Sequence, residues 1–233
     1  MFTGNGLGHI SKAVNLRFFR GCFVILAILS GTGGDWSAAA GPQGESSLPR
    51  SGLAAPTYHG ALVTPPLPKP KFTLTDTSGA PFDFWPETQG YVTLLFFGYT
   101  HCPDECPLHM ANIASSLQQL PAAVGEQVKV VFVTTDPARD SAPVLRAWLD
   151  NFDTRFIGLT GSEAAIAAAQ RAAYLPPASK TAHTDHGYGV NHASFVLAYT
   201  KDNLAHVIYP GGVTAMNWAQ DLPLLVQEAW SSR

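Results

Sequence analysis

Charged residues are scarce in this chain, and it has no basic surplus. They make up 13% of its 233 residues, and 14 Lys and Arg stand against 17 Asp and Glu, a formal net charge of −3. Basic residues are not interleaved with aromatic ones either, so we expect no nucleic-acid partner. The 46% share of hydrophobic residues excludes an intrinsically disordered chain and predicts a globular one.

Cysteine is equally scarce, with only Cys22, Cys102 and Cys106. Cys22 precedes a short apolar run, whereas a lipoprotein cysteine would follow it, so we interpret Cys22 as a small apolar residue. The remaining close pair excludes a small fold stapled by several disulfides, because a domain of this size can fold without them. In an oxidising compartment two such thiols would form a disulfide with no function unless they take part in chemistry. This favours a functional pair.

The first 40 residues lack the run of about 20 apolar residues that a comfortable membrane span needs. They carry positive charges, then a short apolar run, then an Ala-x-Ala pattern: Lys12, Arg17 and Arg20, followed by 21–29 and 37–41. This order is typical of an export signal. We therefore expect an exported, periplasmic protein, with an uncleaved anchor that tethers it to the inner membrane as the second interpretation of residues 1–40.

Residues 41–70 are rich in Gly, Ser, Ala and Pro, and they end in Pro65-Pro66-Leu67-Pro68-Lys69-Pro70. This composition resists regular structure and predicts a semi-rigid tether. The folded domain is expected over residues 71–233.

Strands and helices are predicted to alternate within this domain. The expected strands are 72–76 and 82–84 as a hairpin, then 91–99, 128–135, 156–159, 194–199 and 204–209; the expected helices are 107–120, 143–152, 163–174 and 221–230. Residues 175–191 are expected to form a loop. The pattern predicts an α/β sandwich, with a central mixed sheet flanked by helices and an N-terminal β-hairpin.

Cys102 and Cys106 lie on the turn between the expected strand 91–99 and the expected helix 107–120. A dithiol at this position is typical of a thioredoxin-like fold, and the positive end of the helix lowers thiol pKa values. Three interpretations remain open: a redox dithiol, a metal site that needs further ligands, or a structural disulfide. Three intervening residues, rather than two, still allow a disulfide but also let both sulfurs point at one ion, and thiolates suit Cu(I).

His192 is the strongest candidate for a third donor among eight histidines. It immediately precedes an apolar strand, and in a thioredoxin-like fold this junction returns beside the dithiol turn. We therefore expect Cys102, Cys106 and His192 to form a Cys2His copper site, suited to Cu(I) and also able to take Cu(II).

The other histidines are expected to have ordinary roles. His101 is expected to point away from the sulfurs, and His109 to face solvent from its helix. His183 and His186 are interpreted as solvated loop residues, with a secondary metal site as the less favoured alternative. His59, His206 and His9 are assigned to the tether, the terminal hairpin and the signal.

Four runs of sequence together carry a family resemblance: residues 97–107 (FGYTHCPDECP), 136–140 (DPARD), 156–161 (FIGLTG) and 188–192 (YGVNH). Through them residues 71–212 resemble the SCO/SenC copper chaperones, which assist assembly of the dinuclear copper (CuA) centre of respiratory cytochrome oxidases. The resemblance implies a thioredoxin-like fold, with Cys102, Cys106 and His192 as copper ligands. It also implies two partners, the copper-bearing subunit of a cytochrome c oxidase and a copper donor protein.

One residue departs from the family pattern. The family often has aspartate immediately before the ligand histidine, and this chain has Asn191. The neutral amide removes a nearby negative charge, which could weaken Cu(II) retention or alter docking. Asp136 and Asp185 are candidates to compensate, and Asp136 is equally expected to support the site or only to form a turn with Pro137.

The leading hypothesis is a metallochaperone that delivers copper by stepwise ligand exchange and, breaking no substrate bond, is not an enzyme. The alternative is a thiol-disulfide oxidoreductase that reduces the acceptor's cysteines, with either Cys102 or Cys106 attacking. A peroxiredoxin-like peroxidase fits less well, because Thr100 lies two rather than three residues before Cys102. A structural disulfide in an exported binding domain is a further alternative that we favour less than the metallochaperone.

Overall fold

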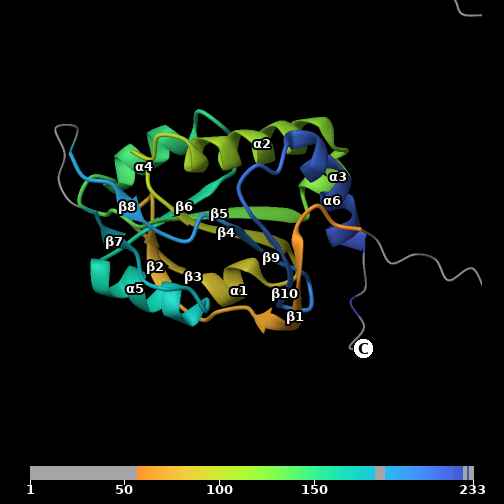
Figure 1. Ribbon diagram of the computed structural model, residues 1–233, viewed down its shortest axis with the longest axis horizontal. Helices are drawn as coiled ribbons and strands as arrows, with labels where there is room; N and C mark the ends of the chain where they lie inside the picture. Colours follow the sequence, from red (N-terminus) through yellow and green to blue (C-terminus); the bar gives the residue numbers. More distant parts are fainter. Residues whose placement is uncertain (1–56, 182–186, 228–229, 231–233) are drawn as a thin grey trace, which may run out of the picture. The chain divides into compact units, whose positions relative to one another are not determined.

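The computed structural model describes residues 57–181, 187–227 and 230. An eight-stranded sheet with the order β1-β10-β9-β4-β5-β6-β2-β3 lies at its centre, and β7 and β8 form a separate two-stranded sheet (Figure 1). The strands are β1 Ala61–Pro68, β2 Thr73–Asp76, β3 Pro81–Asp83, β4 Val92–Gly98, β5 Val128–Thr134, β6 Ile157–Thr160, β7 Ser179–Lys180, β8 Val190–Asn191, β9 Val196–Tyr199 and β10 Leu204–Tyr209. The helices are α1 Phe84–Thr88, α2 Glu105–Gln119, α3 Ala122–Gly125, α4 Ala142–Leu149, α5 Glu163–Ala172 and α6 Ala215–Gln227.

Helices cover both faces of the sheet, which explains why β4 is a continuous apolar run. All seven residues of β4 are buried, and successive side chains of a strand point to opposite faces. Leu94 and Phe96 enter a core shared with α2, α4 and α6, whereas Leu95 and Phe97 enter a second core with α1 and α5. Figure 1 shows α2 and α4 above the sheet and α1 and α5 below it.

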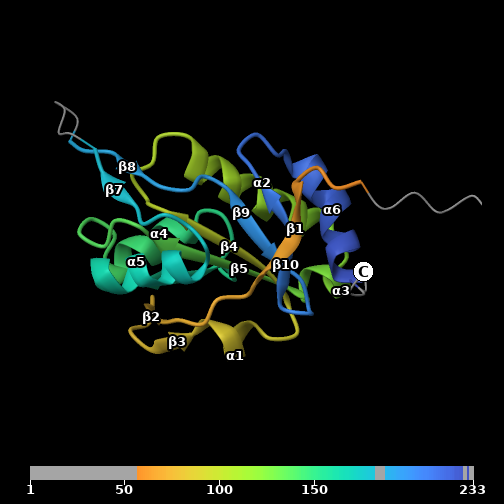
Figure 2. The same cartoon turned by 60° about the horizontal axis from the view of Figure 1, so that its bottom comes forward.

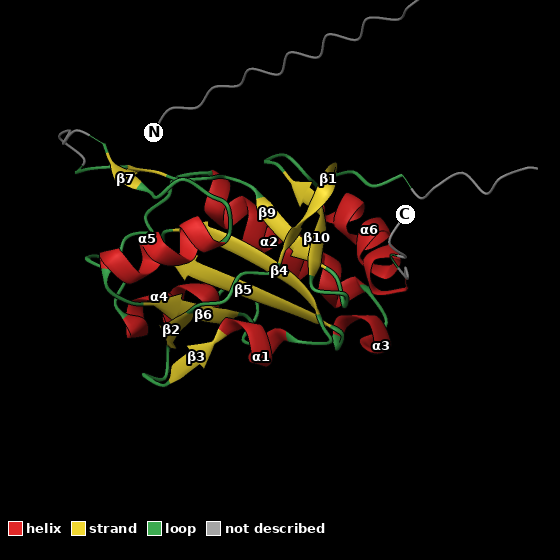
Figure 3. Ribbon diagram, turned by 90° about the horizontal axis from the view of Figure 1, so that it is seen from below, coloured by secondary structure: helices red, strands yellow, loops and turns green. Residues whose placement is uncertain are grey.

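The carboxyl ends of the central parallel strands share one edge of the sheet. Strands β4 and β5 pair in parallel up to Gly98 opposite Thr134, and β6 continues the parallel set (Figure 3). Strand β9 runs antiparallel to β4, so it begins at the same edge where β4 ends. Loops at this edge are where open α/β sheets place their binding sites. The topology therefore brings the chain after β4 close to the chain before β9.

The predicted mixed α/β sheet flanked by helices is confirmed, and so is the N-terminal hairpin, in which Thr73 of β2 pairs with Asp83 of β3. The predicted helix at 163–174 is present as α5, and Ser162 caps it by accepting a hydrogen bond from the amide of Ala165 at 3.2 Å. The hydrophobic pattern was therefore sufficient to find the principal elements.

Strand β1 corrects the expectation that residues 41–70 resist regular structure. Residues 61–68 of that segment pair antiparallel with β10, with Ala61 opposite Ile208 and Pro68 opposite Leu204 (Figure 2). Proline cannot donate to a ladder, but it is tolerated on an edge strand, and β1 is at the end of the strand order. Tertiary pairing thus overrides the local composition at these eight residues.

Several element boundaries also differ from the sequence prediction. Helix α6 begins at Ala215, ahead of the expected start at 221, because Thr214 caps it: its hydroxyl accepts from the Asn217 amide at 3.3 Å. Helix α2 begins at Glu105, so Cys106 lies within its first turn. The short helices α1 and α3 were not predicted, and the expected loop 175–191 contains β7 and β8.

Within the described ranges, the helices are all too short or too polar to cross a bilayer. The predicted export signal at residues 1–40 lies outside the described residues, as does most of the predicted tether.

Candidate metal centre

Cys102, Cys106 and His192 converge at the carboxyl edge of the central strands. Their two sulfurs and one ring nitrogen all lie within 4.8 Å of one another. Cys102 lies on the turn between β4 and α2, Cys106 in the first turn of α2, and His192 directly after β8. This is the one group of three or more metal-binding side chains in the part of the chain that the structure describes.

The ring of His192 is held so that one nitrogen faces the sulfurs. Its Nδ1 lies 3.0 Å from the carbonyl oxygen of Ala193, to which it donates as N–H, and its Nε2 lies 3.6 Å from Cys106 Sγ. Phe96 and Tyr99 meet the ring edge-to-face, with centroid separations of 5.9 and 5.6 Å. A backbone acceptor on one nitrogen fixes the tautomer and leaves the other as a ligand, as in most histidine metal sites.

The two cysteines differ in burial and in protonation. Cys106 is fully buried, whereas Cys102 is half-buried at the protein surface. The hydrogen bond from the Cys106 thiol lowers the pKa of Cys102 to about 3, helped by His192 and by the backbone of Cys106 and Asp104 and opposed by burial. The same bond and burial raise the pKa of Cys106. The two opposite pKa shifts favour a thiolate at Cys102 beside a thiol at Cys106.

Gly98, the last residue of β4, makes room for the buried sulfur. A Cβ atom at this position would lie 2.8 Å from Cys106 Sγ and 2.7 Å from Cε1 of Phe96. Real Cβ atoms do not approach other atoms so closely, and the neighbours are packed core side chains. Glycine is thus required by the close approach of α2 to the end of β4.

The expectation that His109 faces solvent is wrong. His109 is 2% exposed, and its Nε2 lies 3.2 Å from the carbonyl oxygen of Ser194, two residues after His192. Its ring packs against Phe96 at 5.0 Å, and burial lowers its pKa. The helix face that carries His109 turns toward the start of β9, so His109 ties α2 to the segment that follows His192 without joining the ligand group.

The remaining described histidines lie outside the ligand group. His101 is exposed, with Nδ1 3.0 Å from Thr100 Oγ1, as expected for a residue that points away from the sulfurs. His59 contacts the buried carboxylate of Asp221 at 2.7 Å, and His206 contacts Asp202 at 2.7 Å. The predicted alternative site at His183 and His186 lies outside the described residues.

Asp136 lies outside the ligand group and contacts residues near it. Its carboxylate is fully buried and is paired with Arg139 and the hydroxyl of Tyr188. It also forms a turn, because its carbonyl accepts from the amides of Arg139 and Asp140. The predicted turn is therefore present, and the carboxylate of Asp136 also contacts the segment that leads to His192. Asp185 lies outside the described residues.

The donor set fits copper as a bound cargo. Thiolates are soft ligands that favour Cu(I), and imidazole also suits Cu(II). On zinc, thiolate sulfur and imidazole nitrogen bind at about 2.0–2.3 Å from the metal. Three donor atoms at such distances in a trigonal arrangement lie roughly 3.5–4 Å from one another. The sulfurs and nitrogen, within 4.8 Å of one another, need only a small contraction to bind one ion.

Comparison with known proteins shows the family to which the chain is similar. The SCO1/SenC family model matches residues 64–227. A Stutzerimonas stutzeri protein named as a candidate copper-binding protein is 38% identical over 125 residues, which cover 53% of this chain and 60% of that protein. A mitochondrial SCO2 homologue of Bos taurus is 33% identical over 117 residues, which cover 50% of this chain and 44% of that protein. The chain thus spans about half the length of the curated relatives that it matches.

A solved structure is similar as well. The structure of ScoI from Bradyrhizobium japonicum was determined with copper bound, and its sequence is 29% identical to this chain. The superposition covers 69% of this chain and 99% of the ScoI chain, with a TM-score of 0.61. The family match extends over well more than half of the sequence and includes all three clustered side chains. This chain therefore belongs to the SCO1/SenC family.

Proposed function

We propose that this protein is a copper metallochaperone. The observation that carries the proposal is the convergence of two sulfurs and one imidazole nitrogen within 4.8 Å at an edge of the domain. The copper-bound ScoI relative supports copper as the metal. By the family resemblance, the acceptor is the CuA centre of a respiratory cytochrome c oxidase, and a donor protein supplies the copper.

Three ligands suit transfer better than storage. A three-coordinate ion leaves an approach open, so an incoming thiolate of the acceptor can bind before an outgoing ligand leaves. Cys102 and His192 are only partly buried, whereas Cys106 is fully buried. The acceptor therefore displaces Cys102 or His192 first and Cys106 last. Because each metal–ligand bond that breaks is replaced, no substrate bond is cleaved and the protein is not an enzyme.

The N-terminal segment completes the proposal. Residues 1–40 have the order of an export signal, which supports a periplasmic location for the domain, either released or held at the inner membrane by an uncleaved anchor. That compartment would give it access to a copper-bearing subunit exposed outside the membrane.

Copper titration of the reduced protein tests the metal-carrier function. We expect one copper ion per chain, and with Cu(II) we expect thiolate-to-metal charge-transfer absorption, because sulfur ligates the ion directly. Replacing Cys102 by serine should remove most of that absorption. A reduced protein that binds no copper would leave only the disulfide interpretations of the pair.

A second candidate function, thiol-disulfide exchange, is favoured by the asymmetry of the two thiols. Half-buried Cys102 can reach a partner, and fully buried Cys106 cannot. The Cys102 thiolate would attack one sulfur of the acceptor disulfide and expel the other as a thiolate. Cys106 would then attack Cys102 Sγ and release the second acceptor thiolate. The acceptor is reduced by two electrons, and this protein is oxidised to its disulfide.

The pH dependence of alkylation tests this second function. Because the pKa of Cys102 is lowered to about 3, its thiolate is already present above that pH. The rate of iodoacetamide reaction with Cys102 should therefore stay nearly constant from pH 5 to 8, whereas a thiol with the ordinary pKa of about 8.5 reacts about tenfold faster per pH unit. The Cys102→Ser variant, which retains only the buried Cys106 in the domain, should react slowly throughout. A tenfold rise per unit for Cys102 would contradict the assignment of Cys102 as the attacking thiol.

A further inference from the structure

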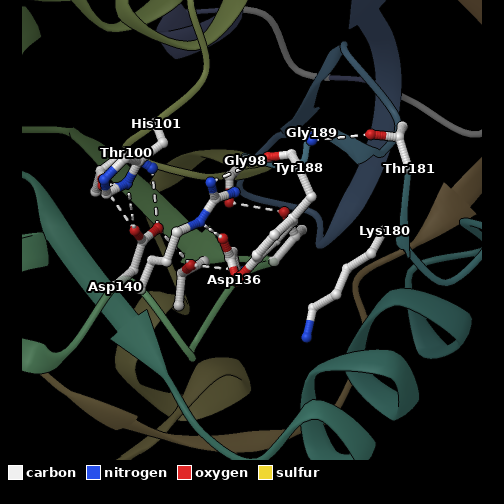
Figure 4. Close-up of polar contacts among 12 residues, drawn as sticks. Gly98, Thr100, His101, Asp136, Asp140, Lys180, Thr181, Tyr188 and Gly189 are labelled. Carbon is white, nitrogen blue, oxygen red and sulfur yellow. Dashed lines mark hydrogen bonds and ion pairs between the residues drawn. The ribbon is translucent and has the colours of Figure 1, made fainter. Parts of the chain in front are cut away.

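The loop 136–140, between β5 and α4, contacts both halves of the candidate metal centre. One side of this loop binds the turn that carries Cys102, and the other side binds the segment that leads to His192 (Figure 4). The cysteine turn and the histidine segment are about 90 residues apart in sequence, and Cys106 Sγ and His192 Nε2 lie 3.6 Å apart in space. The loop 136–140 adds to the strand pairing of β4 with β9 and to the contact of His109 with Ser194, which also hold these parts together.

Asp140 holds the cysteine turn. Its fully buried carboxylate accepts the amide of Thr100 at 2.9 Å and the hydroxyl of Thr100 at 2.6 Å. The hydroxyl of Thr134, at the end of β5, donates to the same carboxylate at 2.7 Å. Asp140 thereby fastens the residue two positions before Cys102 to the central sheet.

Arg139 holds the histidine segment. Its Nη1 donates to the carbonyl of Tyr188 at 3.0 Å, and its guanidinium carbon lies 3.8 Å from the centre of the Tyr188 ring. Its Nε donates to the buried carboxylate of Asp136, which also accepts the Tyr188 hydroxyl at 2.9 Å. The guanidinium and Asp136 thus bind the backbone, ring and hydroxyl of a residue four positions before His192.

We propose that Arg139 is a positioning residue for copper binding, which sets the place of His192 through Tyr188, while the adjacent Asp140 independently sets the cysteine turn. This inference rests on the proposed function for its metal, but its geometry can be measured in the metal-free protein. Arg139 lies outside the ligand group. Besides the histidine segment, its guanidinium lies 5.7 Å from the ring centre of Tyr99, which itself packs on the His192 ring.

The planar guanidinium is the part of Arg139 that this role requires. It donates to a carboxylate and to a carbonyl in fixed directions while its face stacks on an aromatic ring, and an ammonium group cannot do all three at once. Arg139→Lys should therefore restore only part of what Arg139→Met loses. Tyr188→Phe removes the hydroxyl but keeps the ring and the carbonyl, so it should have the smallest effect of the three.

NMR of the reduced, metal-free protein tests the geometry. In the wild type we expect nuclear Overhauser contacts between the His192 ring and the rings of Phe96 and Tyr99, whose centroids lie 5.9 and 5.6 Å away. Arg139→Met should weaken or abolish both contacts. Asp140→Asn should keep the contact with Phe96, which lies in β4 and not in the cysteine turn. The control is Arg155→Met, which removes an exposed arginine that pairs with Asp153 just before β6, at the opposite end of the parallel strands.

Copper binding supplies the second readout. Arg139→Met should lower copper affinity about 10–100-fold, the range known for groups that orient a metal ligand. The nitrogen coupling of bound Cu(II) in electron paramagnetic resonance should decrease while thiolate absorption persists, because only the imidazole is displaced. Asp140→Asn should instead reduce the thiolate absorption and keep the nitrogen coupling. The control variant Arg155→Met should match the wild type in both measurements.

The outcomes separate this inference from the proposed function. A wild type that binds no copper would refute the metal carrier, yet the ring contacts of His192 would still test the role of Arg139. If Arg139→Met keeps those contacts and wild-type affinity, the positioning role is wrong, even if copper binds well. Should Arg139→Met fail to fold, Arg139→Lys decides the matter: full affinity and unchanged nitrogen coupling in that variant would show that the guanidinium geometry is not needed.

Discussion

Replacing His192 by alanine should abolish tight copper binding and leave dithiol exchange largely intact. Its Nε2 is the sole nitrogen donor of the ligand group, and the two sulfurs remain in place because they belong to the turn and to α2. The loss of affinity should exceed the roughly 10–100-fold typical of residues that only orient a ligand. Competition with a chromophoric copper chelator measures the affinity, and exchange with a model disulfide measures the thiol chemistry.

The matched control for this variant is His206→Ala. His206 lies in β10 and outside the ligand group, and its ring contacts Asp202 at 2.7 Å. This variant should bind copper like the wild type. If His192→Ala kept full copper affinity, the third ligand would be another group and the metal-carrier proposal would need a different site.

Gly98→Ala should both destabilise the protein and weaken copper binding. The new methyl group would lie 2.8 Å from Cys106 Sγ, 2.7 Å from Phe96 and 3.1 Å from Phe132, so packed core atoms must move. Overpacking of this kind typically costs about 1–3 kcal/mol of unfolding free energy. Since Cys106 must shift relative to His192 Nε2, copper affinity should also fall. Denaturant unfolding and chelator competition measure the two effects.

Gly125→Ala is the control for a glycine-to-alanine change. A Cβ at Gly125, in α3, would meet no atom closer than 3.8 Å outside its own helix, which is ordinary van der Waals contact. This variant should keep wild-type stability and copper affinity. A Gly98→Ala protein with unchanged affinity would show that Cys106 can move without disturbing the ligand group.

The sequence predicted the central sheet because its physical signal is local. Residues 92–98 and 128–134 are near-continuous apolar runs, and such runs indicate strands covered on both faces. The thioredoxin-like placement of the dithiol then indicated where the chain before β9 returns, so Cys102, Cys106 and His192 could be grouped before their distances were known.

The features that sequence reasoning missed depend on tertiary contacts. His109 has the spacing of a helix surface residue, and only the path of the chain after His192 buries it. Arg139 and Tyr188 belong to two of the runs that carry the family resemblance, but no local pattern predicts their contact, because 49 residues of sequence separate them. The presence of both runs in one chain was the only indication in the sequence. Their physical connection is the contact between the loop 136–140 and the histidine segment.

The proline-rich β1 has a consequence for the behaviour of the folded protein in concentrated solution. An open sheet edge normally invites another chain to add a strand, which leads to aggregation. One edge strand of the sheet is β1, which has no amide hydrogens at Pro65, Pro66 and Pro68. The other edge strand is β3, which is only three residues long. The same residues that hid a strand from sequence analysis therefore protect the domain from self-association through its backbone.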